Sequence, residues 1–271
     1  MNRRTFLQSG ATFASMSLIA SSGMASLSSA QESPVPPLPP PGADGWISLL
    51  NFKNLDGFYT MLEHSPKGVA EKKGMVTFED GMLHIMGNLV TDEPAEAGYI
   101  ATHQEFANYR LRAEYKWGVK RFPPRLDTRR DSGVLYHLVG EDKVWPNCVE
   151  CQIEEAGTCD YFLLGDTRAV PEHEEQIGGV GPDGKHLSNR KIKELGAPLE
   201  DLNGWNVIEV IVQGNQSTQI LNGAALNTLS GFQWADPKNP GQWVPLTRGK
   251  IAIEIEYAET WYRRLEIKAL A

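Results

Sequence analysis

One short row of acidic and amide side chains has the residue types and the spacing for chemistry. Glu150, Gln152 and Glu154 occupy alternate positions of a predicted β-strand over 147–154, so they share one face. The residues that share the other face are Val149, Cys151 and Ile153. Carboxylates and an amide in one row can bind sugar hydroxyls, hold a hard cation or move protons. We therefore expect the row to form the solvated floor of a cleft, with the apolar side chains facing a core.

A second predicted strand repeats this pattern near the C-terminus. Glu254 and Glu256 alternate with isoleucines, and carboxylates of two neighbouring strands can close around one divalent cation. The imidazole of His137, in a predicted strand over 132–138, could act as a base or as a metal ligand near neutral pH. The sequence thus predicts a metal site, its ion unidentified, made by His137, Glu150, Glu254 and Glu256. The alternatives are a structural histidine and edge-strand charges that oppose aggregation.

An acid–base reaction on a sugar needs a base, an acid and groups that hold the substrate. The predicted catalytic residues are His137, Glu150 and Asp160. The predicted substrate-binding residues are Gln152, Glu154, Trp145, Arg263 and Trp261. The two indoles could stack on sugar faces, although aromatic side chains more often serve in cores.

Many short strands are predicted around these residues. Asp80-Gly81 and Gly214-Asn215 lie between alternating segments and indicate β-hairpins. Helical periodicity is confined to 190–195, and no internal repeat is found. The predicted fold class is therefore all-β, a sandwich or jelly roll of two antiparallel sheets. The polar stretch 165–202 is long for a loop of a compact domain, and it could form a lid over the acidic row.

The first 45 residues are expected to lie outside this domain. Residues 1–30 contain Arg3-Arg4, a weakly apolar stretch and small residues before Ala30, which predicts a twin-arginine signal peptide. Residues 31–45 are rich in proline and predict a stiff linker. The domain then spans 46–271, and the protein is expected in the periplasm or the medium.

The net charge of −8 argues against nucleic acid and anionic membranes as partners. After removal of the signal peptide, no apolar run has the roughly 18 residues of a membrane span, so no membrane association is expected. The three cysteines are an odd number in one short segment, and we expect buried thiols rather than a disulfide framework.

Five segments together resemble one protein family. They are 45–51, the Asp-Ser-Gly strand 131–136, the Glu-x-Gln-Ile strand 150–153, the Trp-Asn to Asn-Gly hairpin 205–223, and the closing pair 249–270 with Arg263. The sequence is thereby similar to the 3-keto-disaccharide hydrolase domain family over about 46–271. This resemblance implies the concanavalin-like jelly roll of lectins and glucanases.

The resemblance also implies a reaction. A ketone at C3 of a sugar acidifies the C2 proton, so a base can remove this proton and the C1 substituent can leave by β-elimination. Water then adds to the enone. We expect a carbohydrate substrate and no nucleotide cofactor. Whether the protein holds one divalent metal ion stays open. His137, Glu254, Glu256 and Cys159 depart from the residues that we expect in the family.

Two other functions stay open at this point. The Glu-x-Gln-x-Glu pattern of 150–154 also resembles the Glu-x-Asp-x-Glu strand of glycoside hydrolase family 16, in which two glutamates serve a retaining mechanism. A lectin-like carbohydrate-binding module without turnover would place the same row against a sugar. Fold alone does not decide between them.

Overall fold

A computed structural model describes residues 36–91, 95–172, 186–187 and 199–271. Strands and loops make up these ranges, and no helix occurs in them. The strands are β1 Ile47–Ser48, β2 Phe58–Leu62, β3 Val76–Glu79, β4 Met82–Ile85, β5 Gly98–Thr102, β6 Tyr109–Arg121, β7 Asp131–Val139, β8 Asn147–Glu154, β9 Tyr161–Leu164, β10 Thr167–Pro171, β11 His186–Leu187, β12 Asn206–Gln213, β13 Gln216–Leu221, β14 Ala224–Ala235, β15 Trp243–Pro245, β16 Lys250–Ile255 and β17 Ala258–Ala269.

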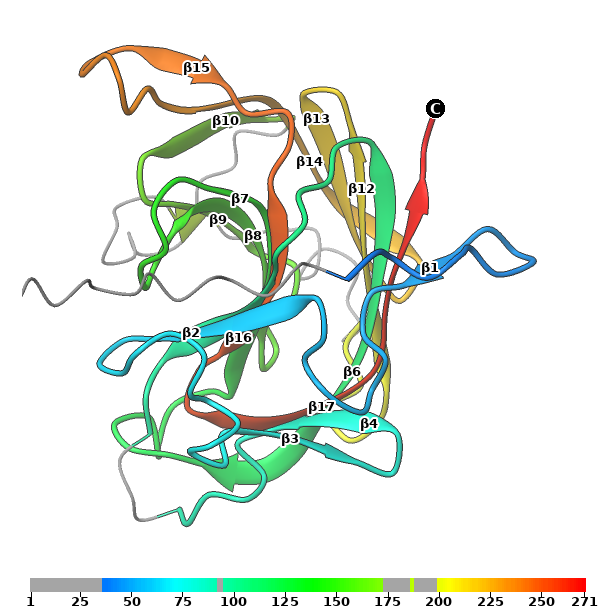
Figure 1. The fold of residues 1–271 in the computed structure, drawn as a ribbon, viewed down its shortest axis with the longest axis vertical. Coiled ribbons are helices and arrows are strands. Elements are labelled where there is room, and N and C mark those ends of the chain that lie inside the picture. The colour runs from blue at the N-terminus through cyan, green and yellow to red at the C-terminus, as the bar shows by residue number, and fades with distance from the viewer. Residues whose placement is uncertain (1–35, 92–94, 173–185, 188–198) are drawn as a thin grey trace, which may run out of the picture. The chain divides into compact units, whose positions relative to one another are not determined.

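The strands form two antiparallel sheets. The ten-stranded sheet has the order β10-β14-β13-β12-β6-β17-β4-β3, with β1 paired to β17 and β15 paired to β14. The seven-stranded sheet has the order β11-β9-β8-β7-β16-β5-β2. Figure 1 shows β12 and β13 of the first sheet on one side, and β8 and β9 of the second on the other. This architecture confirms the predicted jelly-roll sandwich.

The core lies between the two sheets, where each strand contributes alternate side chains. Val149, Cys151 and Ile153 of β8 are buried in it, as the sequence predicted. Side chains of β6, β12 and β17 approach from the ten-stranded sheet, among them Leu111, Val210 and Leu265. This burial of one face of each sheet fixes the register, because a slip by one residue would turn the apolar side chains outward.

The two predicted hairpins are confirmed. β3 and β4 flank Asp80 and Gly81, whose φ angles are 50° and 72°. Positive φ at both central residues is the geometry that matches the twist of the strands, and glycine adopts it without steric cost. β12 and β13 pair around Gly214-Asn215, where the first central residue, Gly214, has a φ angle of 60°.

The described part of the predicted linker, residues 36–45, lies against the domain. Leu38 packs against the core, and Lys268 Nζ donates a hydrogen bond of 2.9 Å to the Asp44 carbonyl oxygen. Proline-rich chain loses little entropy on ordering, because its φ angles are already fixed. This explains how a segment that reads as a spacer can form contacts with the core.

The region 165–202 is only partly the loop that we expected. Its first part forms β10, which pairs with β14 at the edge of the ten-stranded sheet. β14 itself has no strong alternation in the sequence and was not predicted. The predicted helical turn at 190–195 lies outside the described residues. Within the described ranges, no helix has the length and hydropathy of a membrane span.

Candidate active site on the outer face of the seven-stranded sheet

The outer face is the face of the seven-stranded sheet that is turned away from the ten-stranded sheet. Val149 and Cys151 of β8 point into the core. The alternate residues of the strand, Glu150 and Gln152, therefore lie on the outer face. Glu254 reaches it from β16, between the core residues Ile253 and Ile255. β7 runs between β8 and β16 and separates the two glutamates by one strand.

Glu150 and Glu254 meet above Gly133, which lies on β7 between them. A Cβ atom built on Gly133 would lie 2.7 Å from Glu150 Oε1 and 2.6 Å from Glu254 Oε2. Strands two apart in a sheet are separated by roughly 9–10 Å, a gap that two glutamate side chains can close only across an empty position. The missing side chain of Gly133 therefore makes room for the pair.

The two carboxyl groups share a hydrogen bond, which requires a proton on one of them. Glu254 Oε2 finds no N–H or hydroxyl donor among the described residues. Burial and then the charge of Glu150 raise the pKa of Glu254 well above its usual range. Burial, followed by the charges of Asp131 and Glu256, raises the pKa of Glu150 as well, whereas the hydrogen bond with Glu254 lowers it. When the pair holds a single proton, these effects favour Glu254 as its carrier.

Asp131 and Glu256 continue the acidic cluster toward one end of the sheet. Asp131 is the cross-strand partner of Glu154 on one side and of Glu256 on the other. Arg125 binds both Asp131 and Glu256, the second at 2.8 Å between Nη2 and Oε1. Burial raises the pKa of each of the two carboxyl groups, and the Arg125 charge opposes this rise.

The acidic row is buried rather than solvated, which corrects the expectation from the sequence. Glu150 and Gln152 are 4% and 7% exposed, and Glu254 is 2% exposed. Glu154 is the more open member and pairs with Arg129 at 3.2 Å. The alternation of polar and apolar residues in the sequence predicts which side chains share a face. It does not predict whether other parts of the chain cover that face.

A cationic cluster occupies the other end of the same face. It consists of Tyr59, Lys67, Asp142 and Lys250. The Tyr59 hydroxyl donates to Asp142 Oδ1 at 2.5 Å and accepts from Lys250 Nζ at 2.9 Å. Lys67 Nζ lies 2.7 Å from Asp142 Oδ2 and 3.8 Å from the centre of the Tyr59 ring. Burial and the bond to Asp142 raise the pKa of Tyr59, so this phenol stays protonated.

Tyr99 links the two ends of the face. It is the cross-strand partner of Glu254, and its ring packs edge-on against Tyr59 with 6.3 Å between centroids. Trp145 packs against the apolar cluster that Tyr59 and Tyr99 share on this face. Asp160 is buried beside Gln152, whose backbone N–H donates to the Asp160 backbone carbonyl oxygen at 2.9 Å.

His137 does not join the carboxyl groups. A bulge in β7 between Tyr136 and Val139 takes it out of the alternation, and its φ angle is 56°. The imidazole is fully buried and packs at 5.5 Å against Phe232 of the opposite sheet. Burial lowers its pKa to about 4. The sequence could not foresee the bulge, so the predicted partnership of His137 with Glu150 has no support in the geometry.

Trp261 and Arg263 lie on the other sheet. Trp261 of β17 stacks on His84 at 3.4 Å between ring centroids, and Arg263 Nη2 donates to Glu114 Oε1 at 2.6 Å. Both partners belong to strands of the ten-stranded sheet, where alternation turns them away from the core. The structure therefore separates these two predicted substrate contacts from Glu150.

The predicted metal ligands do not form a metal centre. Among the described residues, no group of three or more histidine, cysteine, aspartate or glutamate side chains is arranged to hold an ion. His137 packs against the opposite sheet, and burial raises the pKa of Glu150, Glu254 and Glu256, which disfavours the ionised form that a metal ligand needs. The residues present thus do not fit the predicted four-ligand set.

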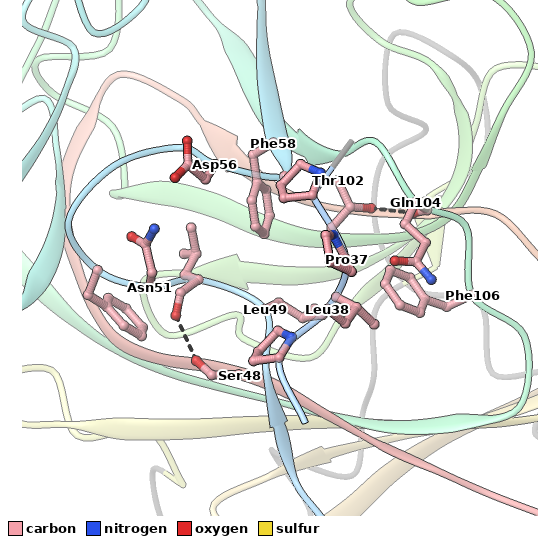
Figure 2. Close-up of a pocket in the computed structure, with 15 residues that line it drawn as sticks. Pro37, Leu38, Ser48, Leu49, Asn51, Asp56, Phe58, Thr102, Gln104 and Phe106 are labelled. Atoms are coloured by element: carbon pink, nitrogen blue, oxygen red, sulfur yellow. Dashed lines mark hydrogen bonds between the residues drawn. The ribbon is translucent and has the colours of Figure 1, made fainter. Parts of the chain in front are cut away.

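A cavity of about 560 Å³ lies elsewhere, between the proline-rich segment and the edge of the sandwich. Figure 2 shows Pro37 and Leu38 beside Phe58 and Phe106, with Asp56 as the one acidic side chain of the lining. No base and acid converge in this cavity. The carboxyl cluster is the better candidate for chemistry because its ionisable groups are close together and perturb one another.

Several residues of the outer face were missed by reasoning from the sequence. Arg125 and Asp131 stand in a stretch whose density of charge was noticeable, and Asp131 opens the Asp-Ser-Gly motif. Tyr59, Tyr99 and Lys250 alternate along their strands with residues that face the core. Only the strand order, which brings β2 and β5 next to β16, reveals that they share a face with Glu254.

The family model for the 3-keto-alpha-glucoside-1,2-lyase-like domain matches residues 45–268. The chain belongs to this family. Membership connects the protein with carbohydrate chemistry and confirms the resemblance seen in the sequence. A comparison with curated proteins gives no match.

Several solved structures are similar to this chain, and the first named here shows the same fold. A protein from Parabacteroides distasonis ATCC 8503, described as a glycosyl hydrolase, is 17% identical, with 84% of this chain and 95% of that chain covered and a TM-score of 0.52. A second protein so described from the same organism is 20% identical, with 83% and 99% covered and a TM-score of 0.49. A Bacillus licheniformis β-glucanase is 14% identical, with 73% and 83% covered and a TM-score of 0.36.

Proposed function

We propose that this protein cleaves 3-keto glycosides on the outer face of the seven-stranded sheet, and that the Glu150–Glu254 pair moves the protons. Family membership supports the substrate class. The observation that carries the residue assignment is the convergence of the two carboxyl groups above Gly133. A pair that holds one proton offers an ionised base and a protonated acid at neighbouring positions.

The proposed reaction starts at C2 of the oxidised sugar. Glu150, the ionised member, takes the C2 proton, and the electron pair moves toward the C3 ketone. The ketone re-forms, the C1–C2 double bond forms, and the C1–oxygen bond breaks. Glu254, the protonated member, gives its proton to the departing oxygen. Water can then add at C1, with return of a proton to C2, which yields the free 3-keto sugar.

The buried position of the pair supports this assignment of roles. Glu254 lies close to both Glu150 and Glu256, and after burial the charges of these two carboxyl groups raise its pKa. It is therefore the group that retains a proton, as a general acid must. In the family 16 mechanism, Glu150 and Glu154 would have to face each other. Glu150 instead meets Glu254 above Gly133, and Glu154 pairs with Arg129, which favours the Glu150–Glu254 pair over that mechanism.

The test compares a 3-keto glucoside with the matching unoxidised glucoside, in both anomers, and follows aglycone release with and without EDTA. We expect release from the keto compound only, with exchange of the C2 hydrogen for solvent deuterium. Glu150→Gln and Glu254→Gln should each lower the rate about 10²–10⁴-fold. Release from the unoxidised glucoside would contradict the proposal, and sugar binding without release would indicate a lectin-like module. The EDTA arm reports whether a divalent ion takes part.

We also propose that the chain is exported by the twin-arginine route and cleaved after Ala30. The Arg3-Arg4 pair and the small residues before the cleavage position support this proposal. Mass spectrometry of the exported protein should find an N-terminus at Gln31. Replacement of both arginines by lysine should keep the protein in the cytoplasm, and continued export of that variant would contradict the proposal.

A further inference from the structure

The cationic cluster lies on the same sheet face as the Glu150–Glu254 pair and has no part in the proton transfers proposed above. On β16, Lys250 and Glu254 are four residues apart with the same parity, so their Cα atoms are separated by roughly 13 Å. Ala252, which lies between them, is small and apolar. The face thus has a carboxyl end and a cationic end, with the buried residues Ala252 and Tyr99 between them.

The charges of the cationic cluster do not balance. Two ammonium groups, Lys67 and Lys250, share a single carboxylate, Asp142. Among the residues that the structure describes, no other carboxylate pairs with either lysine. Each ammonium group has three donors, and the contacts above leave donors free on both. One lysine would be enough to neutralise Asp142, so the second leaves a positive charge on a protein of net charge −8.

The geometry of the cluster holds this charge in place. Tyr59 is 6% exposed and binds Asp142 and Lys250 through its hydroxyl, while both ammonium groups lie over its ring at 3.8 and 4.7 Å. The side chains of Lys67 and Lys250 stay 40% and 21% exposed. A partly exposed ammonium group that is fixed by a buried phenol is ready to bind an anion with little loss of side-chain entropy.

We propose that the cationic cluster is a second subsite, which binds a carboxylate on the leaving half of the glycoside. This inference rests on the proposed function, because it assigns the sugar that reacts to the carboxyl end. The preferred substrate class is then a 3-keto glycoside whose aglycone carries an acidic group. Lys67 and Lys250 bind that group, and the partly buried Trp145 packs against the apolar cluster that contains Tyr59.

The test uses a matched pair of aglycones, 4-hydroxybenzoate and 4-hydroxybenzamide, which differ in charge but little in size. Their unoxidised glucosides, in both anomers, are titrated by calorimetry into the mature protein, and their 3-keto glucosides are assayed for release. We expect about tenfold tighter binding and about tenfold higher kcat/KM for the acid at low salt, both falling as salt rises.

Lys67→Met should reduce this preference to near one. Lys73→Met is the matched control, because Lys73 is similarly exposed and pairs with Glu96 in the same loop region. The control should keep the preference. Equal binding of acid and amide by the unmodified protein, or a preference that survives Lys67→Met, would overturn the inference. Preferential binding of the acid without release from either keto glucoside would support the subsite and contradict the proposed function.

Discussion

Glu150 and Glu254 reach each other across an intervening strand, over the one position where no side chain stands between them. This relationship depends on three elements at once: the parity of β8, the parity of β16 and a glycine on β7. Since β7 pairs with both neighbours, the position of the pair is fixed by the backbone hydrogen bonds of the sheet. Such fixed carboxyl groups are suited to proton transfer, because little reorganisation is needed when the charge moves.

Gly133→Ala should abolish activity and leave the fold intact. The added methyl group would meet Glu254 Oε2 at 2.6 Å and Glu150 Oε1 at 2.7 Å, so both side chains must turn away. A displacement of about 1 Å can cost about 10²-fold in rate. Aglycone release and the melting temperature should be measured together. Full activity of the folded variant would show that the pair does not need its present geometry.

The contribution of Glu254 to the stability of the protein should fall as the pH rises above about 4.5, the ordinary pKa of glutamate. The pKa of Glu254 is raised in the folded protein by burial and by neighbouring carboxyl groups, so the folded state binds more protons than the unfolded state. This contribution is fully present below the ordinary pKa and is lost as the pH rises toward the folded pKa.

Glu254→Gln should therefore flatten the pH dependence of stability. At pH 8 we expect a free energy of unfolding higher than that of the unmodified protein by on the order of 1–3 kcal/mol. Urea unfolding between pH 5 and pH 8 measures both slopes. Glu105→Gln, at an exposed pair with Arg248, is the control and should leave the slope unchanged. Equal slopes for Glu254→Gln and the unmodified protein would contradict the raised pKa.

Alternation and turn pairs predicted most of what fixes the outer face. They identified β8, β16 and the hairpin around Gly81. They also assigned Glu150 and Val149 to opposite faces of β8 correctly. They could not give the strand order, so Tyr99 was not seen beside Glu254, and Trp261 was not assigned to the opposite sheet. The bulge that diverts His137 leaves no alternation signal, because it depends on hydrogen bonds with two neighbouring strands.

His137→Phe should retain catalysis and improve stability under acid. The imidazole is fully buried, has no hydrogen-bond partner among the described residues, and has its pKa lowered to about 4. A neutral buried histidine stabilises the fold above its ordinary pKa of 6.5, and this contribution is lost as the pH falls toward 4. Phenylalanine removes the titrating group. Thermal unfolding at pH 4 and pH 7, together with kcat, provides the check; a large loss of kcat with normal stability would restore a catalytic role for His137.

Glu155→Gln should loosen the loop that carries Arg125 and Asp131. Hydrogen bonds from Arg130 lower the pKa of Glu155 to about 2, and Arg121 adds a bond of 2.8 Å. The stabilisation is present above pH 4.5 and is lost as the pH falls toward 2. Because the side chain is 20% exposed, solvent screening limits the cost of the substitution to about 1–2 kcal/mol at pH 7.

The neighbouring Glu154→Gln provides the control for this prediction. Among the residues that the structure describes, the Glu154 carboxylate pairs with Arg129 alone, at 3.2 Å. That arginine is 59% exposed, so the loss of this pair should cost less stability than the loss of the Glu155 contacts. Denaturant unfolding at pH 7 and pH 3 measures both variants, and the difference between them should shrink at pH 3. Hydrogen exchange in 123–131 should rise in Glu155→Gln alone. Equal stability of the two variants at pH 7 would mean that Arg130 does not anchor the loop through Glu155.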